Sequence, residues 1–323
     1  MTASRSPNAG QIQQMVSLLY QLAPNEGYNL SPLANVRFLR SNRPLSVTPV
    51  LYDPGIIIVC QGCKRGYLGD QVYVYDAQHY LAVSVPVPFT METDASAEQP
   101  LLAIYFRLDF DMLADLLLQM DGQGAADAAP KGMFATVMDA RMSASVLRLL
   151  QAMTEPMEAR ILGPALVKEI YLRVLTGDQG ASMRAALLNE GQFGKVAKAI
   201  RRIHASYRDK LDVELLAGEA GMSTPSFHAH FKLVTSTSPM QYLKSTRLHQ
   251  ARLLMARQGL GAASASAQVG YESASQFSRE FKRLFGSTPV KEVERMKQAF
   301  ALPDPGPASM SNSAWGMHYV SSH

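Results

Sequence analysis

The chain has 323 residues, 47% of them hydrophobic and 18% charged, which excludes a largely disordered protein and predicts about two domains. No stretch approaches the roughly 18 consecutive apolar residues of a membrane span, the first residues lack a signal-peptide core, and two cysteines cannot form a disulfide framework. The sequence therefore predicts a cytoplasmic protein without a membrane partner, with a net charge of +4 that is unevenly distributed.

Residues 28–107 contain short apolar, β-branched runs separated by turn signals, a pattern typical of strands. The runs are 56–61, 72–75, 80–85 and 101–106. Pro86 and Pro88 are expected to end the third run or to place it at a sheet edge. Several short strands at this spacing predict a small, cupin-like β-barrel or a sandwich.

Cys60 and Cys63 form a C-x-x-C pair beside Lys64 and Arg65. Two positive side chains would lower the pKa of a nearby thiol, so a redox- or electrophile-sensing role is one hypothesis. Alternatively, neither cysteine has a chemical role: Cys60 is a buried strand residue and Cys63 lies near it by chance. A zinc site would need two more ligands nearby, and the sequence shows none.

Residues 109–175 have the apolar spacing of helices over 110–120, 146–153 and 162–175. Helices that follow a compact β unit usually close its core, and the alternative is a dimer interface. Three glycines, Gly177, Gly180 and Gly191, indicate a linker over 177–192, and residues 301–323 are a low-complexity tail.

The region from 190 to 300 is basic and contains an internal repeat. It carries 17 Lys and Arg against 9 Asp and Glu, whereas residues 1–189 carry 14 against 17. Segment 223–232 recurs as 273–282, so that Phe227 matches Phe277 and Phe231 matches Phe281 at an offset of 50. A repeat of this length is a supersecondary unit used twice. Its charge favours a polyanion as partner, although a solvated basic surface is the simpler alternative.

Each repeat has the sequence pattern of a helix-turn-helix. In the first, Asp212 and Ser223 are expected to cap two helices that are separated by Gly221. In the second, Gly270 is the turn and Ser273 the cap. The paired phenylalanines at i and i+4 face the core of each unit, which leaves the other side of each second helix exposed.

The stretch 238–254 resembles the central helix of AraC/XylS-type transcription regulators, and 270–289 resembles their second helix-turn-helix. The resemblance covers about residues 195–297 and, more weakly, 20–175, which look like an N-terminal effector-binding domain. After Thr288-Pro289 the sequence departs from the family pattern, since Glu292-Val-Glu-Arg295 replaces an aromatic residue and an arginine.

The resemblance implies two recognition helices in successive major grooves of double-stranded DNA. By position, the base-facing residues are Thr224, Pro225, His228 and Ala229 in the first helix and Ser275, Gln276 and Arg279 in the second. Arg279 suits guanine and Gln276 suits adenine, although a phosphate contact or an internal salt bridge near Glu280 is the alternative for Arg279. The expected phosphate contacts are Lys232, Lys244, Lys282 and Arg283.

Enzyme chemistry is not expected. His79 is the only histidine before residue 204, His228 and His230 have the wrong helical spacing for a metal pair, and no phosphate loop or nucleophile motif is present. We therefore expect no metal and no cofactor, and a ligand-binding enzyme with an accessory nucleic-acid domain is the unfavoured alternative. A pocket for a small organic effector remains, with Tyr52, Phe89, Met91 and Tyr105 as candidate lining residues.

The sequence thus predicts an α+β protein: a small, cupin-like β-barrel with packing helices, followed by an all-α tandem helix-turn-helix domain. The expected divisions are an effector-binding and dimerisation domain (1–176), a linker (177–192), the DNA-binding domain (193–300) and a flexible tail (301–323). The expected function is a homodimeric, sequence-specific regulator of transcription, an activator that responds to a small organic effector and contacts RNA polymerase.

Overall fold

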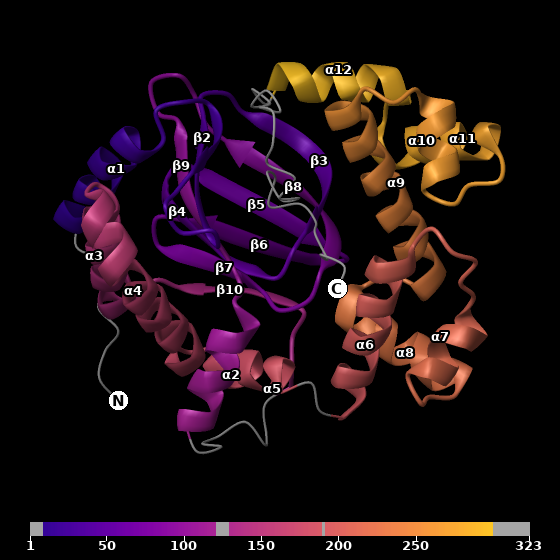
Figure 1. Ribbon diagram of the computed structural model, residues 1–323, viewed down its shortest axis with the longest axis horizontal. Helices are drawn as coiled ribbons and strands as arrows, with labels where there is room; N and C mark the ends of the chain where they lie inside the picture. The colour runs from indigo at the N-terminus through magenta and orange to yellow at the C-terminus, as the bar shows by residue number, and fades with distance from the viewer. Residues whose placement is uncertain (1–8, 121–128, 189–190, 300–323) are drawn as a thin grey trace.

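The computed structural model describes residues 9–120, 129–188 and 191–299 (Figure 1). One face of a curved antiparallel sheet is covered by N-terminal helices, and C-terminal helices pack against the other face. Within the described ranges, no helix is both long and apolar enough to cross a membrane. The α+β fold class that the sequence predicts, a barrel-type sheet followed by helix-turn-helix units, is confirmed.

The sheet runs in the order β1-β2-β9-β4-β7-β6-β5-β8-β3, and β10 pairs with β7. Its strands are β1 (Gly27–Leu30), β2 (Val36–Ser41), β3 (Leu45–Tyr52), β4 (Gly55–Gln61), β5 (Cys63–Leu68), β6 (Gln71–Asp76), β7 (His79–Val83), β8 (Val87–Asp94), β9 (Leu101–Arg107) and β10 (Met133–Val137). The four expected strands correspond to β4, β6, β7 and β9. Pro88 pairs with Leu51 of β3, whereas the pairing of β5 with β8 begins only at Thr90. The proline thus lies where β8 has a single partner strand.

Strand β4 shows why the central strands are apolar without a break. Ile57 and Val59 belong to the hydrophobic cluster that the sheet shares with the C-terminal helices. Ile56 and Ile58 belong to the cluster on the other face, because successive strand side chains point to opposite sides. A strand covered on both faces needs an apolar residue at every position.

The helices of the N-terminal region are α1 (Ala9–Leu22), α2 (Phe110–Gln119), α3 (Ala140–Met153), α4 (Pro156–Thr176) and α5 (Gly180–Leu187). Helices α1, α3 and α4 lie together on one side of the sheet (Figure 1). The three expected helices are present as α2, α3 and α4, whereas α1 was not anticipated. The expectation of helices alone over 109–175 is corrected by β10, which pairs antiparallel with β7.

The segment expected to be a linker contains α5, and Met183 of this helix is buried in the cluster of the N-terminal region. Most of 177–192 is therefore packed structure, and only 189–190 lie outside the described residues. The expected tail, 301–323, lies outside the described residues altogether.

The C-terminal helices are α6 (Gly191–Ser206), α7 (Val213–Glu219), α8 (Thr224–Thr235), α9 (Pro239–Gln258), α10 (Ala262–Gln268), α11 (Ala274–Phe285) and α12 (Pro289–Ala299). Helices α7–α8 and α10–α11 are the two expected helix-turn-helix units, and α9 joins them. The turn glycines, Gly221 and Gly270, have φ angles of +63° and +84°, a region that favours glycine. Asp212 and Ser273 cap α7 and α11 as expected, whereas the Ser223 side chain makes no cap hydrogen bond to α8.

The paired phenylalanines form the cores of the two units, as the repeat predicts. Phe227, Phe231, Phe277 and Phe281 are fully buried. The first pair lies in the same hydrophobic cluster as the sheet, whereas the second pair lies in a separate cluster with Phe285. The first unit is therefore continuous with the core of the sheet, and the second has a core of its own.

Candidate nucleic-acid interface and interdomain cavities

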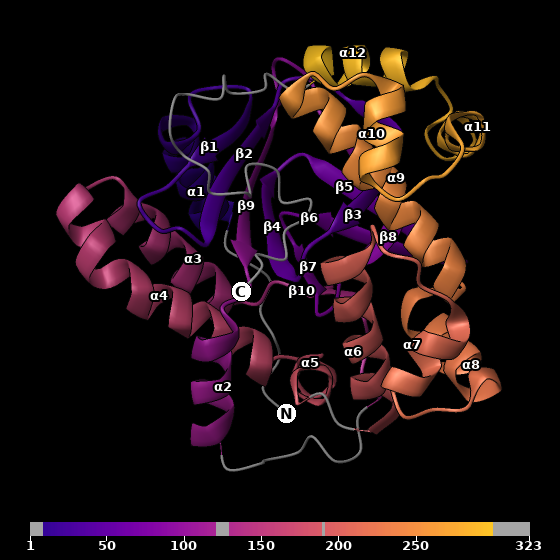
Figure 2. The same cartoon turned by 45° about the vertical axis from the view of Figure 1, so that its right-hand side comes forward.

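Helix α8 presents the residues expected to read DNA in the first unit. Pro225, His228 and Ala229 are exposed, and Thr224 is half-buried in the first turn. Figures 1 and 2 both place α8 and α11 on the outer side of α9. This face is accessible to a partner.

Helix α11 presents Ser275, Gln276 and Arg279 on its exposed side. Within the described part of the chain, the Arg279 guanidinium has no hydrogen-bond or ion-pair partner. Its neighbour Glu280 instead accepts a hydrogen bond from Lys244, at 2.9 Å. The internal salt bridge that was the alternative for Arg279 is therefore not formed here, and the guanidinium is available to DNA.

The expected phosphate contacts fall into two groups. Lys232, Lys282 and Arg283 are exposed on the second halves of α8 and α11, where a phosphate backbone could reach them. Lys244 lies on α9 and is held by Glu280. The assignment of all four to phosphate stays a prediction.

Helices α6 and α9 connect the DNA-binding region to the sheet through a polar contact. The Tyr242 hydroxyl donates to the Pro86 carbonyl at 2.8 Å and lies 2.7 Å from His204 Nε2. Since the hydroxyl has a single proton, His204 Nε2 must be the donor in the second bond. Burial lowers the pKa of His204 to about 4, so the imidazole is neutral at physiological pH.

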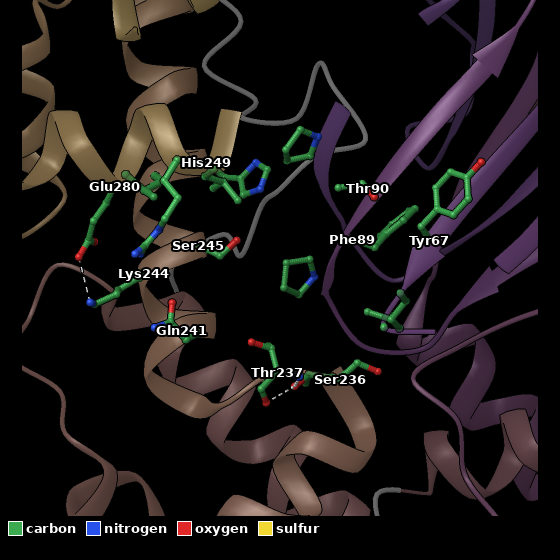
Figure 3. A pocket seen from close by; sticks show the side chains of 18 residues that line it. Tyr67, Phe89, Thr90, Ser236, Thr237, Gln241, Lys244, Ser245, His249 and Glu280 are labelled. Atoms are coloured by element: carbon green, nitrogen blue, oxygen red, sulfur yellow. Dashed lines mark hydrogen bonds and ion pairs between the residues drawn. The ribbon is translucent and has the colours of Figure 1, made fainter. Parts of the chain in front are cut away.

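A cavity of about 350 Å³ lies between the sheet and the second unit, and we call it the interdomain cavity (Figure 3). Tyr67, Phe89 and Thr90 line it from the sheet side. Helix α9 contributes side chains that include Lys244 and His249, and α11 contributes Glu280. Any occupant would therefore touch both domains.

A second cavity, of about 210 Å³, is lined in part by Lys64, Met91 and Thr93, and we call it the Lys64 cavity. Lys64 is 3% exposed, and its Nζ contacts Thr93 Oγ1 at 2.9 Å and Met91 Sδ at 3.4 Å. Burial lowers its pKa to about 7. The other basic residues that line this cavity are Arg40, Arg43 and Arg295.

The structure corrects the expected chemistry of the two cysteines. Burial raises the pKa of the Cys60 thiol to about 12. Burial also raises that of Cys63, although Arg65 acts in the opposite direction. Lys64 does not lower either one, because its side chain points into its own cavity. Thiolates at Cys60 and Cys63 are therefore disfavoured, and a redox role stays an untested hypothesis without its expected physical basis.

The four effector-pocket candidates separate into two pairs. Phe89 lines the interdomain cavity and Met91 lines the Lys64 cavity. Tyr52 and Tyr105 line neither, and Tyr52 instead packs edge-to-face on Phe89 with ring centroids 4.8 Å apart. Within the described residues, no group of three or more His, Cys, Asp or Glu side chains converges on a metal position.

Two residues that the sequence did not single out for these roles are central to the site. Lys64 appeared only as a neighbour of the cysteines, and its signal was a lysine inside a predicted strand. Glu280 appeared only as a possible partner of Arg279, and its signal was its i+4 spacing from Gln276. Both roles depend on contacts with residues distant in the sequence.

A sheet domain followed by two helix-turn-helix units on one joining helix defines a class of two-domain DNA-binding proteins. The "AraC-type transcriptional regulator N-terminus" family matches residues 32–182, and a "Helix-turn-helix domain" family matches residues 216–295. The chain belongs to the AraC family of transcriptional regulators.

Two named relatives each match less than a third of the chain. RclR of Escherichia coli (strain K12), an "RCS-specific HTH-type transcriptional activator", is 40% identical over 86 residues, 27% of this chain and 30% of that protein. The regulator AlkR of Acinetobacter baylyi is 33% identical over 95 residues, 29% of this chain and 31% of that protein. The chain thus spans under a third of the length of these relatives.

Solved structures match over most of the chain. Wild-type ToxT from Vibrio cholerae strain SCE256, with an unsaturated fatty acid bound, has a TM-score of 0.57 at 13% identity, and the match covers 83% of this chain and 97% of ToxT. An apo variant of ToxT from the same strain has a TM-score of 0.54 at 10% identity, and the match covers 84% of this chain and 99% of that one. At this identity the likeness shows the fold alone.

Proposed function

We propose that this protein is a sequence-specific DNA-binding activator of transcription that responds to a small organic effector and has no enzymatic activity. The observation that carries the proposal is the repeated helix-turn-helix, whose second recognition helix presents an exposed Arg279 without an internal partner among the described residues. The net positive charge of 190–300 supplies attraction to DNA. RclR, named an activator, supports the direction of regulation.

The test compares a base-reading residue with a phosphate-binding one on the same helix. Duplexes selected by the protein from a randomised library are titrated with wild type, Arg279→Ala and Lys282→Ala over a range of salt concentrations. Arg279→Ala should lose about 1–3 kcal/mol of discrimination at one G·C pair. Lys282→Ala should weaken binding to all sequences and reduce the salt slope by about one. If binding showed no sequence preference and Arg279→Ala bound like wild type, the sequence-specific function would be excluded, and the region would be only a basic helical domain.

The effector in this proposal is a small organic anion held at Lys64. A buried ammonium group is costly without a counter-charge, and the contacts of Lys64 Nζ are a hydroxyl and a thioether. Leu39, Leu45 and Leu101 provide apolar contact in the same cavity, and Arg295 brings in the DNA-binding domain. ToxT, which has a similar fold, is described with an unsaturated fatty acid bound.

Calorimetric titration with carboxylates of increasing chain length, an unsaturated fatty acid among them, tests this site. Wild type should bind at least one of them, and Lys64→Met should weaken that binding about tenfold or more, since a hydrogen bond to a charged group is lost. The control is Lys131→Met, an exposed lysine. If Lys64→Met and wild type bound the carboxylate equally well, the Lys64 cavity would be excluded as the effector site.

Three further parts of the proposal concern partners and location. The protein acts as a homodimer through α4, which exposes the apolar side chains of Met157, Ile161 and Leu162. As an activator it contacts RNA polymerase, which transcription in vitro with and without the protein would measure. Its location is the cytoplasm, where a regulator of this family meets DNA.

A further inference from the structure

The carboxylate of Glu280 is a meeting point of three side chains at the edge of the second recognition helix. Its Oε1 accepts hydrogen bonds from Lys244 Nζ at 2.9 Å and from Gln276 Nε2 at 3.3 Å. Its Oε2 accepts from the Tyr271 hydroxyl at 2.7 Å. One acidic side chain thus joins α11 to α9 and to the turn that precedes α11.

Glu280 is ionised at neutral pH. Burial raises the pKa of its carboxyl, but the hydrogen bonds from Tyr271, Lys244 and Gln276 lower it by more, so that the pKa lies below its usual range. An ionised carboxylate has no proton to donate and only accepts. Every group that forms a hydrogen bond with the Glu280 carboxylate must therefore be the donor.

This requirement fixes the orientation of the Gln276 amide. The amide can turn its oxygen or its NH₂ group toward a neighbour, and beside a carboxylate only the NH₂ group is favourable. The second N–H and the amide oxygen are then left for a partner outside the protein. That donor and acceptor pair matches N7 and the N6 amino group of adenine in the major groove.

The first unit provides an internal comparison. At the repeat offset of 50, the positions of Gln276 and Glu280 correspond to Ser226 and His230. There His230 Nδ1 lies 2.8 Å from the Ser226 carbonyl oxygen of the preceding helical turn. The matching pair in α8 therefore holds no carboxylate and no amide, and the device belongs to the second unit alone.

We propose that Glu280 is a specificity-determining positioning residue, which holds the amide of Gln276 in the orientation that reads adenine. The inference rests on the proposed function, since it assumes that α11 enters the major groove. Glu280 does not itself touch a base. Lys244 and Tyr271 in turn keep the carboxylate in place, which gives Lys244 a role other than binding phosphate.

The experiment measures base preference at a single position. Duplexes selected by the full-length wild-type protein from a randomised library are resynthesised with each of the four base pairs at the position where Gln276→Ala loses preference. Binding of wild type, Gln276→Ala, Glu280→Gln and the matched first-unit variant His230→Gln is then compared. Glu280→Gln keeps the size of the side chain but can donate as well as accept, so the amide of Gln276 is no longer forced into one orientation.

Wild type and His230→Gln should prefer adenine about tenfold at this position, the size expected for one bidentate contact. Glu280→Gln should reduce that preference to less than about threefold, while its affinity for DNA with this pair randomised changes less than about twofold. An undiminished adenine preference in Glu280→Gln overturns the proposal. A uniform loss of affinity with the preference retained also overturns it, because Glu280 would then act only on stability. Wild type without any sequence preference overturns the proposed function as well.

Discussion

Arg252 and Glu292 form an ion pair that is almost completely removed from water. Their side chains are 2% and 0% exposed, and Arg252 Nη1 lies 3.1 Å from Glu292 Oε1. Arg295 and Ser287 donate to the same carboxylate, and the Arg252 guanidinium lies over the Phe285 ring. The Glu292 segment, which departs from the family pattern in sequence, thus fastens α12 to α9.

Replacing one partner of this pair should be severe. Glu292→Gln would leave the Arg252 charge buried without its carboxylate, and removal of one partner of a buried pair costs about 3–5 kcal/mol. Urea unfolding should show this loss, whereas Glu294→Gln, at an exposed residue of the same helix, should change stability by less than about 0.5 kcal/mol. Similar midpoints for the two variants would contradict a structural role for the pair.

At the scale of elements, sequence reasoning succeeded where the signals are local. The helix-turn-helix units were predictable because a cap, a turn glycine and an i, i+4 phenylalanine pair all lie within a short segment. Strand β10 was not, because what makes it a strand is its pairing with β7, about 50 residues earlier. The residues of α11 expected to contact bases are exposed as predicted, because helical spacing alone decides which side they lie on. The contact of Glu280 with Lys244 could not be foreseen, because it joins residues far apart in the sequence.

The C-x-x-C pair also shows that neighbours in the sequence need not interact in the fold. Lys64 is adjacent to Cys63 in sequence, and adjacency suggested an effect on the thiol. Successive strand residues point to opposite faces, so the Lys64 amino group lies on the side away from the Cys63 thiol and reaches Met91 and Thr93 of the neighbouring strand. Strand geometry, not distance along the chain, decides which groups interact.

Helix α4 exposes a stripe of apolar side chains. Met157 and Ile161 are 65% and 63% exposed and lie one turn apart, with Leu162 beside them. An exposed apolar stripe of this kind marks an interface. Ile161→Glu should shift the protein from dimer to monomer in sedimentation velocity. Leu233→Glu, which adds the same charge at a still more exposed apolar residue of α8, should leave the dimer intact. A monomeric wild type or a dimeric Ile161→Glu would rule out this interface.

At the scale of the whole molecule, His204 makes stability depend on pH. The imidazole has an ordinary pKa near 6.5 when unfolded and about 4 when folded, because burial disfavours its charged form. As pH falls through this window, the unfolded chain binds a proton that the folded chain does not, so stability is full above about 6.5 and is lost toward pH 4. The loss should reach about 1.4 kcal/mol per pH unit.

Unfolding of wild type and His204→Gln at several pH values between 5 and 7 checks this. Few carboxylates titrate in that range, so the difference between the two proteins isolates the histidine. The free energy of unfolding of His204→Gln should vary less with pH than that of wild type. Parallel pH profiles would contradict the lowered pKa of His204, because the folded and unfolded imidazole would then bind protons alike.

Gly132, the residue before β10, packs tightly against the first unit. A Cβ atom there would lie 2.7 Å from the Val234 carbonyl oxygen on α8 and 3.3 Å from Val85 Cγ2. Neither neighbour is the end of a flexible side chain, so Gly132→Ala must push α8 away from the sheet. Because the sheet and the first unit share one hydrophobic cluster, that displacement should cost about 1–3 kcal/mol, seen as a lower urea midpoint.

Gly218→Ala, in α7 with open space around the new methyl group, should instead raise stability by about 0.5–1 kcal/mol. If both substitutions stabilised the protein alike, the two domains would not be joined by the packing at Gly132, and α8 would be free to move relative to the sheet.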